Sequence, residues 1–179
     1  MSMSFASPDS NISQLGKIDG FLVADFGAGT GAYTIPLARK VGEKGRVYAI
    51  EVQKELLPRI KNTAINQGLS NVEVLWGDVE RHMATKLANN SIDLVILANV
   101  FFQADNKIGL TKEAKRVLKS GGKLLFVDWK DSYGGFGPQP ESIVLPVEAR
   151  KYFETEGFAY EKDIQAGEQH YGFICTKVV

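Results

Sequence analysis

Short apolar runs alternate with segments of helical period along this chain from residue 21 onward. Apolar runs bounded by turn residues are typical of buried strands, and apolar positions three and four apart are typical of helices packed on a sheet. The alternation predicts parallel strands joined by crossover helices, which is a doubly wound α/β sheet. The expected strands are 21–25, 46–52, 72–76, 92–98, 123–129, 158–164 and 171–177, and the expected helices are 33–41, 54–66, 84–88, 107–119 and 147–156.

Two segments near the end of the chain depart from this alternation. The last two expected strands are separated only by a short turn at Ala166-Gly167-Glu168, so we expect them to pair antiparallel. The segment 132–146 is rich in glycine and proline and is expected to be a loop. Its centre, 134–140, combines glycine with proline and an aromatic residue, and we interpret it as a candidate lid over a ligand.

A glycine-rich turn directly follows the first expected strand. Its sequence is Asp25-Phe26-Gly27-Ala28-Gly29-Thr30-Gly31, and a helix is expected immediately after it. Glycines let a polar ligand approach the backbone without a Cβ clash, and the free N–H groups at the helix start face that ligand. The turn therefore predicts a cofactor site at the carboxyl ends of the strands. The same residues also satisfy the G-x-G-x-x-A pattern of dinucleotide-binding proteins, so the glycines alone do not identify the cofactor.

Three other features favour a methionine-like cofactor over a dinucleotide. The carboxylate of Asp25 suits a ligand ammonium, whereas a pyrophosphate would gain nothing from an anion there. Gly77-Asp78 follows the third strand, where a carboxylate can accept a hydrogen bond from the exocyclic amine of adenine. The antiparallel strand pair at the end of the chain is the third feature. Glu51, at the end of the second strand, suits ribose hydroxyls in either case.

These motifs resemble those of class I S-adenosylmethionine-dependent methyltransferases, in order along the chain. Within that superfamily the chain is most similar to the ubiquinone and menaquinone biosynthesis methyltransferase-like branch, through Val127-Asp128-Trp129 and His170-Tyr171-Gly172. The resemblance implies a Rossmann-like seven-stranded sheet, mostly parallel with the last strand antiparallel, and S-adenosyl-L-methionine as the cofactor. It implies a cofactor site at Asp25, Gly27, Ala28, Gly29, Gly31, Glu51, Val52, Asp78, Val79 and Asn99.

Methyl transfer from a sulfonium is an in-line displacement, which mainly requires that the acceptor be aligned with the methyl group and that water be excluded. The reacting methyl is expected over the ends of the first and fourth strands, which makes Asn99 and residues 101–103 candidates for contact with the acceptor. A general base is needed only if the acceptor must lose a proton. Asp128 and His170, at the end of the fifth strand and the start of the last, are the candidate catalytic residues, acting as a His–Asp pair.

Length and composition narrow the class of protein. The 179 residues suit one domain, 1–179, with residues 1–10 expected to be disordered. Lys and Arg together number 21 and Asp and Glu 21, so the formal net charge of zero argues against a nucleic-acid partner and favours a small-molecule acceptor. No segment approaches the roughly 18 apolar residues of a membrane span, so we expect a cytoplasmic monomer or homodimer. One cysteine and two histidines cannot form a zinc cluster, so no metal is expected. Arsenic methylation relies on several thiols, so a single cysteine argues against it.

Other functions stay open at this point. An NAD(P)-dependent oxidoreductase could use the same glycine turn, although no Tyr-x-x-x-Lys pair follows the fourth strand. A nucleic-acid methyltransferase is disfavoured because Ala98-Asn99-Val100-Phe101 lacks the Asn-Pro-Pro-aromatic turn of enzymes that methylate base amino groups. A non-catalytic module that binds the cofactor without turnover would carry the same motifs.

Overall fold

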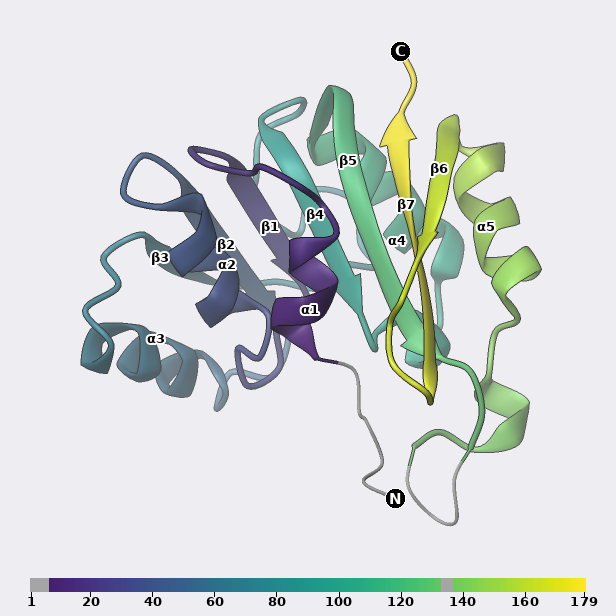
Figure 1. Ribbon diagram of the computed structural model, residues 1–179, viewed down its shortest axis with the longest axis horizontal. Coiled ribbons are helices and arrows are strands. Elements are labelled where there is room, and N and C mark those ends of the chain that lie inside the picture. Colours follow the sequence, from purple (N-terminus) through teal and green to yellow (C-terminus); the bar gives the residue numbers. More distant parts are fainter. Residues whose placement is uncertain (1–6, 133–136) are drawn as a thin grey trace.

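A computed structural model describes residues 7–132 and 137–179 of the chain. A single seven-stranded sheet lies between two layers of helices (Figure 1). The strand order is β3-β2-β1-β4-β5-β7-β6, and β7 is antiparallel to both of its neighbours while the other paired strands are parallel. The strands are β1 (Leu22–Phe26), β2 (Arg46–Glu51), β3 (Val72–Trp76), β4 (Ile92–Ala98), β5 (Leu118–Trp129), β6 (Phe158–Ile164) and β7 (His170–Lys177). This confirms the expected doubly wound sheet and its antiparallel last strand.

The helices divide between the two faces of the sheet (Figure 1). One face is covered by α1 (Pro8–Ser13), α2 (Thr34–Val41) and α3 (Leu57–Asn66). The other face is covered by α4 (Lys107–Val117) and α5 (Pro146–Thr155), with two 3-10 turns, η1 (Phe101–Gln103) and η2 (Pro140–Ser142), near the carboxyl edge of the strands. Among the described residues, no helix has the length and apolar character needed to cross a membrane.

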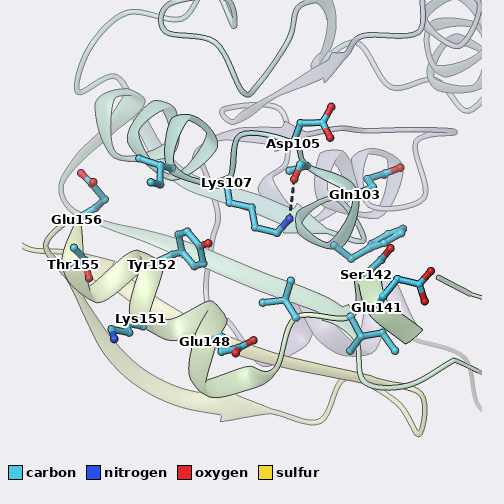
Figure 2. A pocket seen from close by; sticks show the side chains of 15 residues that line it. Gln103, Asp105, Lys107, Glu141, Ser142, Glu148, Lys151, Tyr152, Thr155 and Glu156 are labelled. Atoms are coloured by element: carbon cyan, nitrogen blue, oxygen red, sulfur yellow. Dashed lines mark hydrogen bonds between the residues drawn. The ribbon is translucent and has the colours of Figure 1, made fainter. Parts of the chain in front are cut away.

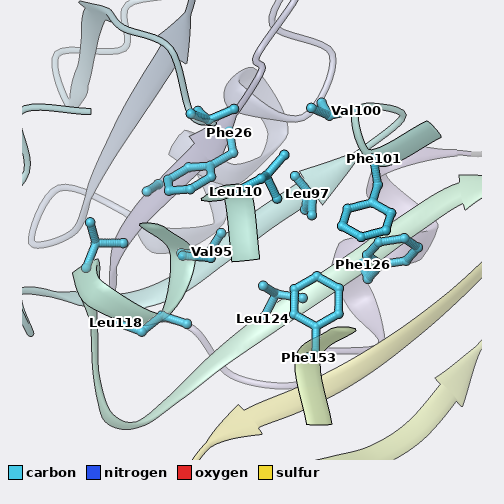
Figure 3. Packing of buried hydrophobic residues seen from close by; sticks show 14 of the residues in the cluster. Phe26, Val95, Leu97, Val100, Phe101, Leu110, Leu118, Leu124, Phe126 and Phe153 are labelled. Atoms are coloured by element: carbon cyan, nitrogen blue, oxygen red, sulfur yellow. The ribbon is translucent and has the colours of Figure 1, made fainter. Parts of the chain in front are cut away.

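A group of aromatic rings fills the core between the sheet and the α4/α5 layer (Figure 3). The ring of Phe126 on β5 stacks on Phe173 of β7 with centroids 4.6 Å apart, and Phe153 of α5 packs edge-on against Phe126 at 5.6 Å. Phe101, the first residue of η1, meets Phe126 at 5.4 Å. Removing a buried Phe side chain typically costs about 3–5 kcal/mol, so Phe101 firmly ties the start of η1 to this core.

The expected helix 84–88 is not present, and this prediction was wrong. Met83 and Lys86 have φ angles of 61° and 62°, which an α-helix does not allow. The segment is held instead by Glu113 of α4, whose carboxylate accepts hydrogen bonds from the backbone N–H of Met83 (3.0 Å) and the hydroxyl of Thr85 (2.6 Å). Hydrogen bonds from a distant helix therefore fix a turn where the local sequence allowed a helix.

Two smaller differences concern segment ends, and one prediction is not tested. Residues 8–10 were expected to be disordered but form the first turn of α1, where the hydroxyl of Ser7 accepts a hydrogen bond from the backbone N–H of Ser10 at 3.4 Å. The helix expected to end at the glycines 121–122 already ends at Val117, and β5 begins directly after it. Residues 134–136 of the candidate lid lie outside the described part of the chain, so the lid stays a prediction.

Candidate active site

A cavity of about 410 Å³ opens at the carboxyl ends of β1 to β4, where the first predicted site lies. All the residues predicted to contact the cofactor line it except Gly31, which lies beside Ile60 of α3. Sequence reasoning missed other lining residues, which flank the motifs and bear no chemical signature of their own. The missed residues are Ala32, Tyr33, Ile50, Gln53, Glu80, Ala98 and Val100, whereas Thr30 and Gly77 belong to the predicted motifs and Gln103 was predicted to contact the acceptor.

The floor of this cavity requires glycine. Gly27 and Gly29 have φ angles of 68° and 56°, in the left-handed region that residues with a side chain rarely adopt. A Cβ atom on Gly27 would lie 2.5 Å from Cγ2 of Val100, so a larger residue would also clash with the segment after β4. The backbone N–H of Gly29 donates to Oε2 of Glu51 at 2.8 Å, which holds the turn against the end of β2.

Glu51 and Asp78 present carboxylates at the ends of β2 and β3. The second oxygen of Glu51 accepts from the backbone N–H of Gln53 at 2.9 Å, and the residue is buried. Asp78 accepts from the backbone N–H of Glu80 at 3.0 Å and pairs with exposed Arg81 at 3.1 Å. Because a carboxylate has about four acceptor positions, both side chains are fixed by the protein and still have lone pairs for a ligand.

Asp25 is the most deeply buried acid of this cavity, at 3% exposure. The hydroxyl of Thr34 donates to its Oδ2 at 2.6 Å. Burial, with a smaller contribution from the negative charge of Glu51, raises the pKa of Asp25 from 3.8 to about 6 against the opposing effect of the Thr34 hydrogen bond. A cation bound beside Asp25 would therefore relieve an unfavourable buried charge.

The arrangement fits S-adenosylmethionine. Carboxylates at the ends of β1, β2 and β3 succeed one another along the edge, in the order that the ammonium, ribose and adenine of an extended ligand require. Asn99 closes the cavity on the β4 side, with a φ of 58° and an Oδ1 atom that has no hydrogen-bond partner within 7–132 and 137–179. A buried acceptor of this kind is satisfied when a polar ligand fills the cavity.

The two candidate catalytic residues do not form the expected pair. In the antiparallel register Asp128 lies opposite Tyr171, and His170 lies opposite Trp129. Neighbouring residues of a strand point to opposite faces of a sheet, so the carboxylate and the imidazole are on different faces. The hypothesis of a His–Asp pair was therefore wrong, because the strand register could not be deduced from the sequence.

Each of the two residues has its own surroundings. Asp128 is 1% exposed and accepts hydrogen bonds from the backbone N–H groups of Phe102 and Trp129, both at 2.8 Å. Burial raises the pKa of Asp128 to about 7, against the opposing effect of these bonds and of Lys107. The ring of His170 lies 4.3 Å from the Trp129 ring, and burial lowers its pKa. Neither residue is among the described residues that line the cavity.

A second and larger cavity, which we call the α4–α5 groove, lies beside the first. Its volume is about 870 Å³, and it runs between α4 and α5 (Figure 2). Gln103 lines both the groove and the cofactor cavity, so η1 separates the two. No local sequence pattern indicated this groove, because its walls come from two helices and a loop far apart in the chain. The lining residues are Phe102–Asp105, Lys107, Ile108, Glu141–Val144, Glu148, Lys151, Tyr152, Thr155 and Glu156.

A sheet of this order with a glycine-floored cavity at its carboxyl edge is the fold of the class I methyltransferases. The family model described as "Methyltransferase domain" matches residues 19–150. The chain belongs to this family and is an S-adenosylmethionine-dependent methyltransferase. A crystal structure of an S-adenosylmethionine-dependent methyltransferase from Aquifex aeolicus is 30% identical, with a TM-score of 0.87, and the match covers 97% of this chain and 91% of that one.

Curated relatives agree with the class and differ in their acceptors. The arsenite methyltransferase of Homo sapiens is 32% identical over 168 residues, which are 88% of this chain and 42% of the relative. The demethylmenaquinone methyltransferase of Lactococcus lactis is 26% identical over 117 residues, which are 65% of this chain and 45% of the relative. The second of these confirms the predicted similarity to the quinone-biosynthesis branch. The chain spans less than half the length of both relatives, so their acceptors are not transferred to it.

Proposed function

We propose that this enzyme transfers a methyl group from S-adenosylmethionine to a small organic molecule by in-line displacement. The main support is the cavity of about 410 Å³, in which the carboxylates of Asp25, Glu51 and Asp78 follow one another along the ends of β1, β2 and β3. Bound there, the cofactor supplies an electrophilic methyl group on a positively charged sulfur. The formal net charge of zero supports a small acceptor rather than a nucleic acid, and we place the protein in the cytoplasm as a monomer or homodimer.

Each proposed cofactor contact follows from the geometry of one group. Asp25 would bind the ammonium group, and Glu51 would accept hydrogen bonds from the ribose hydroxyls. Asp78, with the neighbouring Val79, would bind the adenine amine and ring. The remaining proposed contacts to the same ligand are backbone or apolar contacts from Gly27, Ala28, Gly29 and Val52 and a hydrogen bond to Oδ1 of Asn99. Gly31, which does not line the cavity, would support the turn rather than touch the ligand.

In such a displacement a lone pair of the acceptor forms a bond to the methyl carbon as the carbon–sulfur bond breaks. The enzyme contributes alignment of the two molecules and exclusion of water, which can supply several kcal/mol in comparable reactions. Asn99, Val100 and Gln103 line the cavity on the side of β4, next to β1, and we place the approach of the acceptor there. A proton lost by the acceptor would pass to water or to a nearby base.

The acceptor that we propose is organic rather than arsenite. Cys175 is the single cysteine of the chain, and it is buried in the core beneath α4 and α5. Burial raises the pKa of its thiol well above the usual range, so the reactive thiolate is disfavoured. Arsenic chemistry that depends on several accessible thiols has no equivalent in this chain.

A label-transfer assay tests the proposal. The protein is incubated with methyl-labelled S-adenosylmethionine and panels of phenols, quinols, amines and carbon acids, and both labelled product and S-adenosylhomocysteine are measured. Glu51→Gln should lower cofactor affinity by about tenfold, because one ribose acceptor becomes a donor. Glu73→Gln is the matched control, since Glu73 is an exposed strand carboxylate that pairs with Arg46 outside the cavity. Equal effects of the two substitutions would refute the proposed ribose contact, and no labelled product with any acceptor would count against methyl transfer to small molecules.

A further inference from the structure

The η1 turn separates the cofactor cavity from the α4–α5 groove. It follows β4 directly, and its three residues have three different surroundings. Phe101 is buried in the aromatic core, Phe102 lines the α4–α5 groove, and Gln103 lines both the groove and the cofactor cavity. The position of Gln103 relative to a bound cofactor therefore depends on how rigidly η1 is held.

Both ends of this turn are bound by charged side chains. At its start, Oδ2 of Asp128 accepts a hydrogen bond from the backbone N–H of Phe102 at 2.8 Å. At its end, the ammonium of Lys107 donates to the backbone carbonyl of Ala104 at 2.7 Å, the bond drawn in Figure 2. Above the pKa of Asp128, which is about 7, an anion at the N–H end and a cation at the carbonyl end match the direction of the backbone dipoles. Hydrogen bonds to ionised groups are also stronger than neutral ones.

Asp128 joins this turn to the sheet. Its other oxygen accepts from the backbone N–H of Trp129 at 2.8 Å, so one buried carboxylate holds both η1 and the end of β5. The backbone N–H of Asn99 donates to the carbonyl of Val127 at 2.9 Å, which ties the start of the same segment to β5. Asp128 is not among the described residues that line either cavity. These contacts place Asp128 between η1 and β5, outside both cavities, rather than at the reacting atoms.

We propose that Asp128 and Lys107 are positioning residues that fix η1, and with it Gln103, between the cofactor cavity and the α4–α5 groove. This inference rests on the proposed function, because it assigns η1 to the side on which the acceptor approaches. The contacts proposed for ammonium, ribose and adenine lie at β1, β2 and β3 and do not involve η1. Loss of either positioning residue should therefore loosen η1 and slow turnover while cofactor affinity changes little.

Hydrogen exchange followed by mass spectrometry tests this without a known acceptor. In Asp128→Asn one of the two backbone N–H groups meets an amide donor instead of an acceptor, so peptides covering 99–106 should exchange about tenfold faster than in the wild type. Lys107→Met keeps the apolar stem and removes the ammonium, and should accelerate the same peptides by a smaller factor. The affinity for S-adenosylhomocysteine, measured by calorimetry, should stay within about threefold of the wild type in both variants.

Asp93→Asn is the matched control. Asp93 also accepts from a backbone N–H on a neighbouring strand, that of Leu22 at 2.9 Å, and also pairs with a lysine, Lys119 at 2.7 Å. It lies near the amino end of β4, whereas η1 follows the carboxyl end of the same strand. Its substitution should leave exchange in 99–106 unchanged, which separates a local effect on η1 from a general loss of stability.

The outcomes decide between positioning and proton transfer. Unchanged exchange of 99–106 in both Asp128→Asn and Lys107→Met would overturn the inference. Once an acceptor supports turnover, a kcat that falls with faster exchange and an unchanged pH profile supports positioning. A kcat that falls with unchanged exchange and a lost pH dependence would instead make Asp128 a base. If the wild type does not bind S-adenosylhomocysteine, the proposed function fails, and the exchange data still show whether these side chains hold η1.

Discussion

Replacing Asp25 with Asn removes the buried charge at the centre of the cofactor cavity and little else. The carboxylate is buried and accepts the hydroxyl of Thr34 at 2.6 Å, and the amide oxygen of Asn can accept the same hydrogen bond. Burial raises the pKa of Asp25 from 3.8 to about 6, with a smaller contribution from Glu51. The substitution therefore keeps the local packing and deletes a carboxylate that is costly to ionise while the cavity is empty of ligand.

The sign of the stability effect follows from this pKa. Because the folded pKa of Asp25 lies above the unfolded value, the folded protein binds more protons between about pH 4 and pH 6. Its free energy of unfolding falls as the pH rises through that window and stays lower above it. A shift of about two units corresponds to roughly 3 kcal/mol as an upper limit. Unliganded Asp25→Asn should thus be more stable than the wild type at pH 8, and this difference should shrink toward pH 4.

Cofactor binding should favour the ionised form of Asp25, whereas folding of the unliganded protein favours the protonated form. An ammonium beside Asp25 favours the ionised carboxylate, so binding releases a proton at low pH. If binding of the ammonium returns the pKa of Asp25 from about 6 to its ordinary value of 3.8, the Kd of S-adenosylhomocysteine in the wild type should be about tenfold higher at pH 5 than at pH 7. Asp25→Asn should bind more weakly at pH 7, with a Kd that changes little between these pH values.

Calorimetry at pH 5, 6, 7 and 8, with urea unfolding of the unliganded proteins at the same pH values, measures both effects. The two readouts should move in opposite directions, since the charge that weakens the empty protein strengthens the complex. A variant that binds as tightly as the wild type, with the same pH dependence, would refute the assignment of Asp25 to the ammonium. A variant that is less stable than the wild type at pH 8 would refute the pKa argument.

Other predictions concern the glycine turn, the anchor of the segment after β3 and the single thiol. Gly27→Ala should cost about 1–3 kcal/mol of stability and abolish tight binding of S-adenosylhomocysteine, because its Cβ would lie 2.5 Å from Val100. Gly42→Ala is the control for backbone strain alone, since Gly42 has a φ of 70° and a Cβ there would meet no atom within 4 Å. Equal binding defects in the two variants would contradict this reasoning. Glu113→Gln should lower the free energy of unfolding by about 3–5 kcal/mol, since it leaves the Arg116 guanidinium, whose side chain is 9% exposed, without its charged partner. A change under about 1 kcal/mol in urea unfolding would contradict this. Cys175 should react with a thiol reagent only after denaturation, and rapid labelling of the native protein would contradict its burial.

The strands and the cofactor site were predictable from the sequence because both depend on local patterns. The strands 72–76, 92–98 and 158–164 match their expected bounds, since each is a run of strand-forming residues between turn residues. The glycine turn and Gly77-Asp78 meet in one cavity because parallel strands bring their carboxyl ends to one edge. Knowledge of the topology was enough to bring these motifs together.

The wrong predictions concern residues whose conformation is set by tertiary contacts. The turn at 84–88 depends on bonds from Glu113, which comes later in the chain. The faces of Asp128 and His170 depend on the register between β5 and β7, and a shift of one residue would reverse the face of one of them. The start of α1 was readable in principle, because Ser7 is followed by proline and aspartate, a typical helix N-terminus.

Calorimetric titration of the wild-type protein with S-adenosylhomocysteine, with NADH as the competing ligand, establishes which cofactor the cavity binds. We expect saturable binding of S-adenosylhomocysteine and none of NADH, because the buried carboxylate of Asp25 suits an ammonium and would repel a pyrophosphate. Tight binding of NADH without binding of S-adenosylhomocysteine would overturn the proposed cofactor and would make Glu51 the ribose ligand of a nicotinamide cofactor.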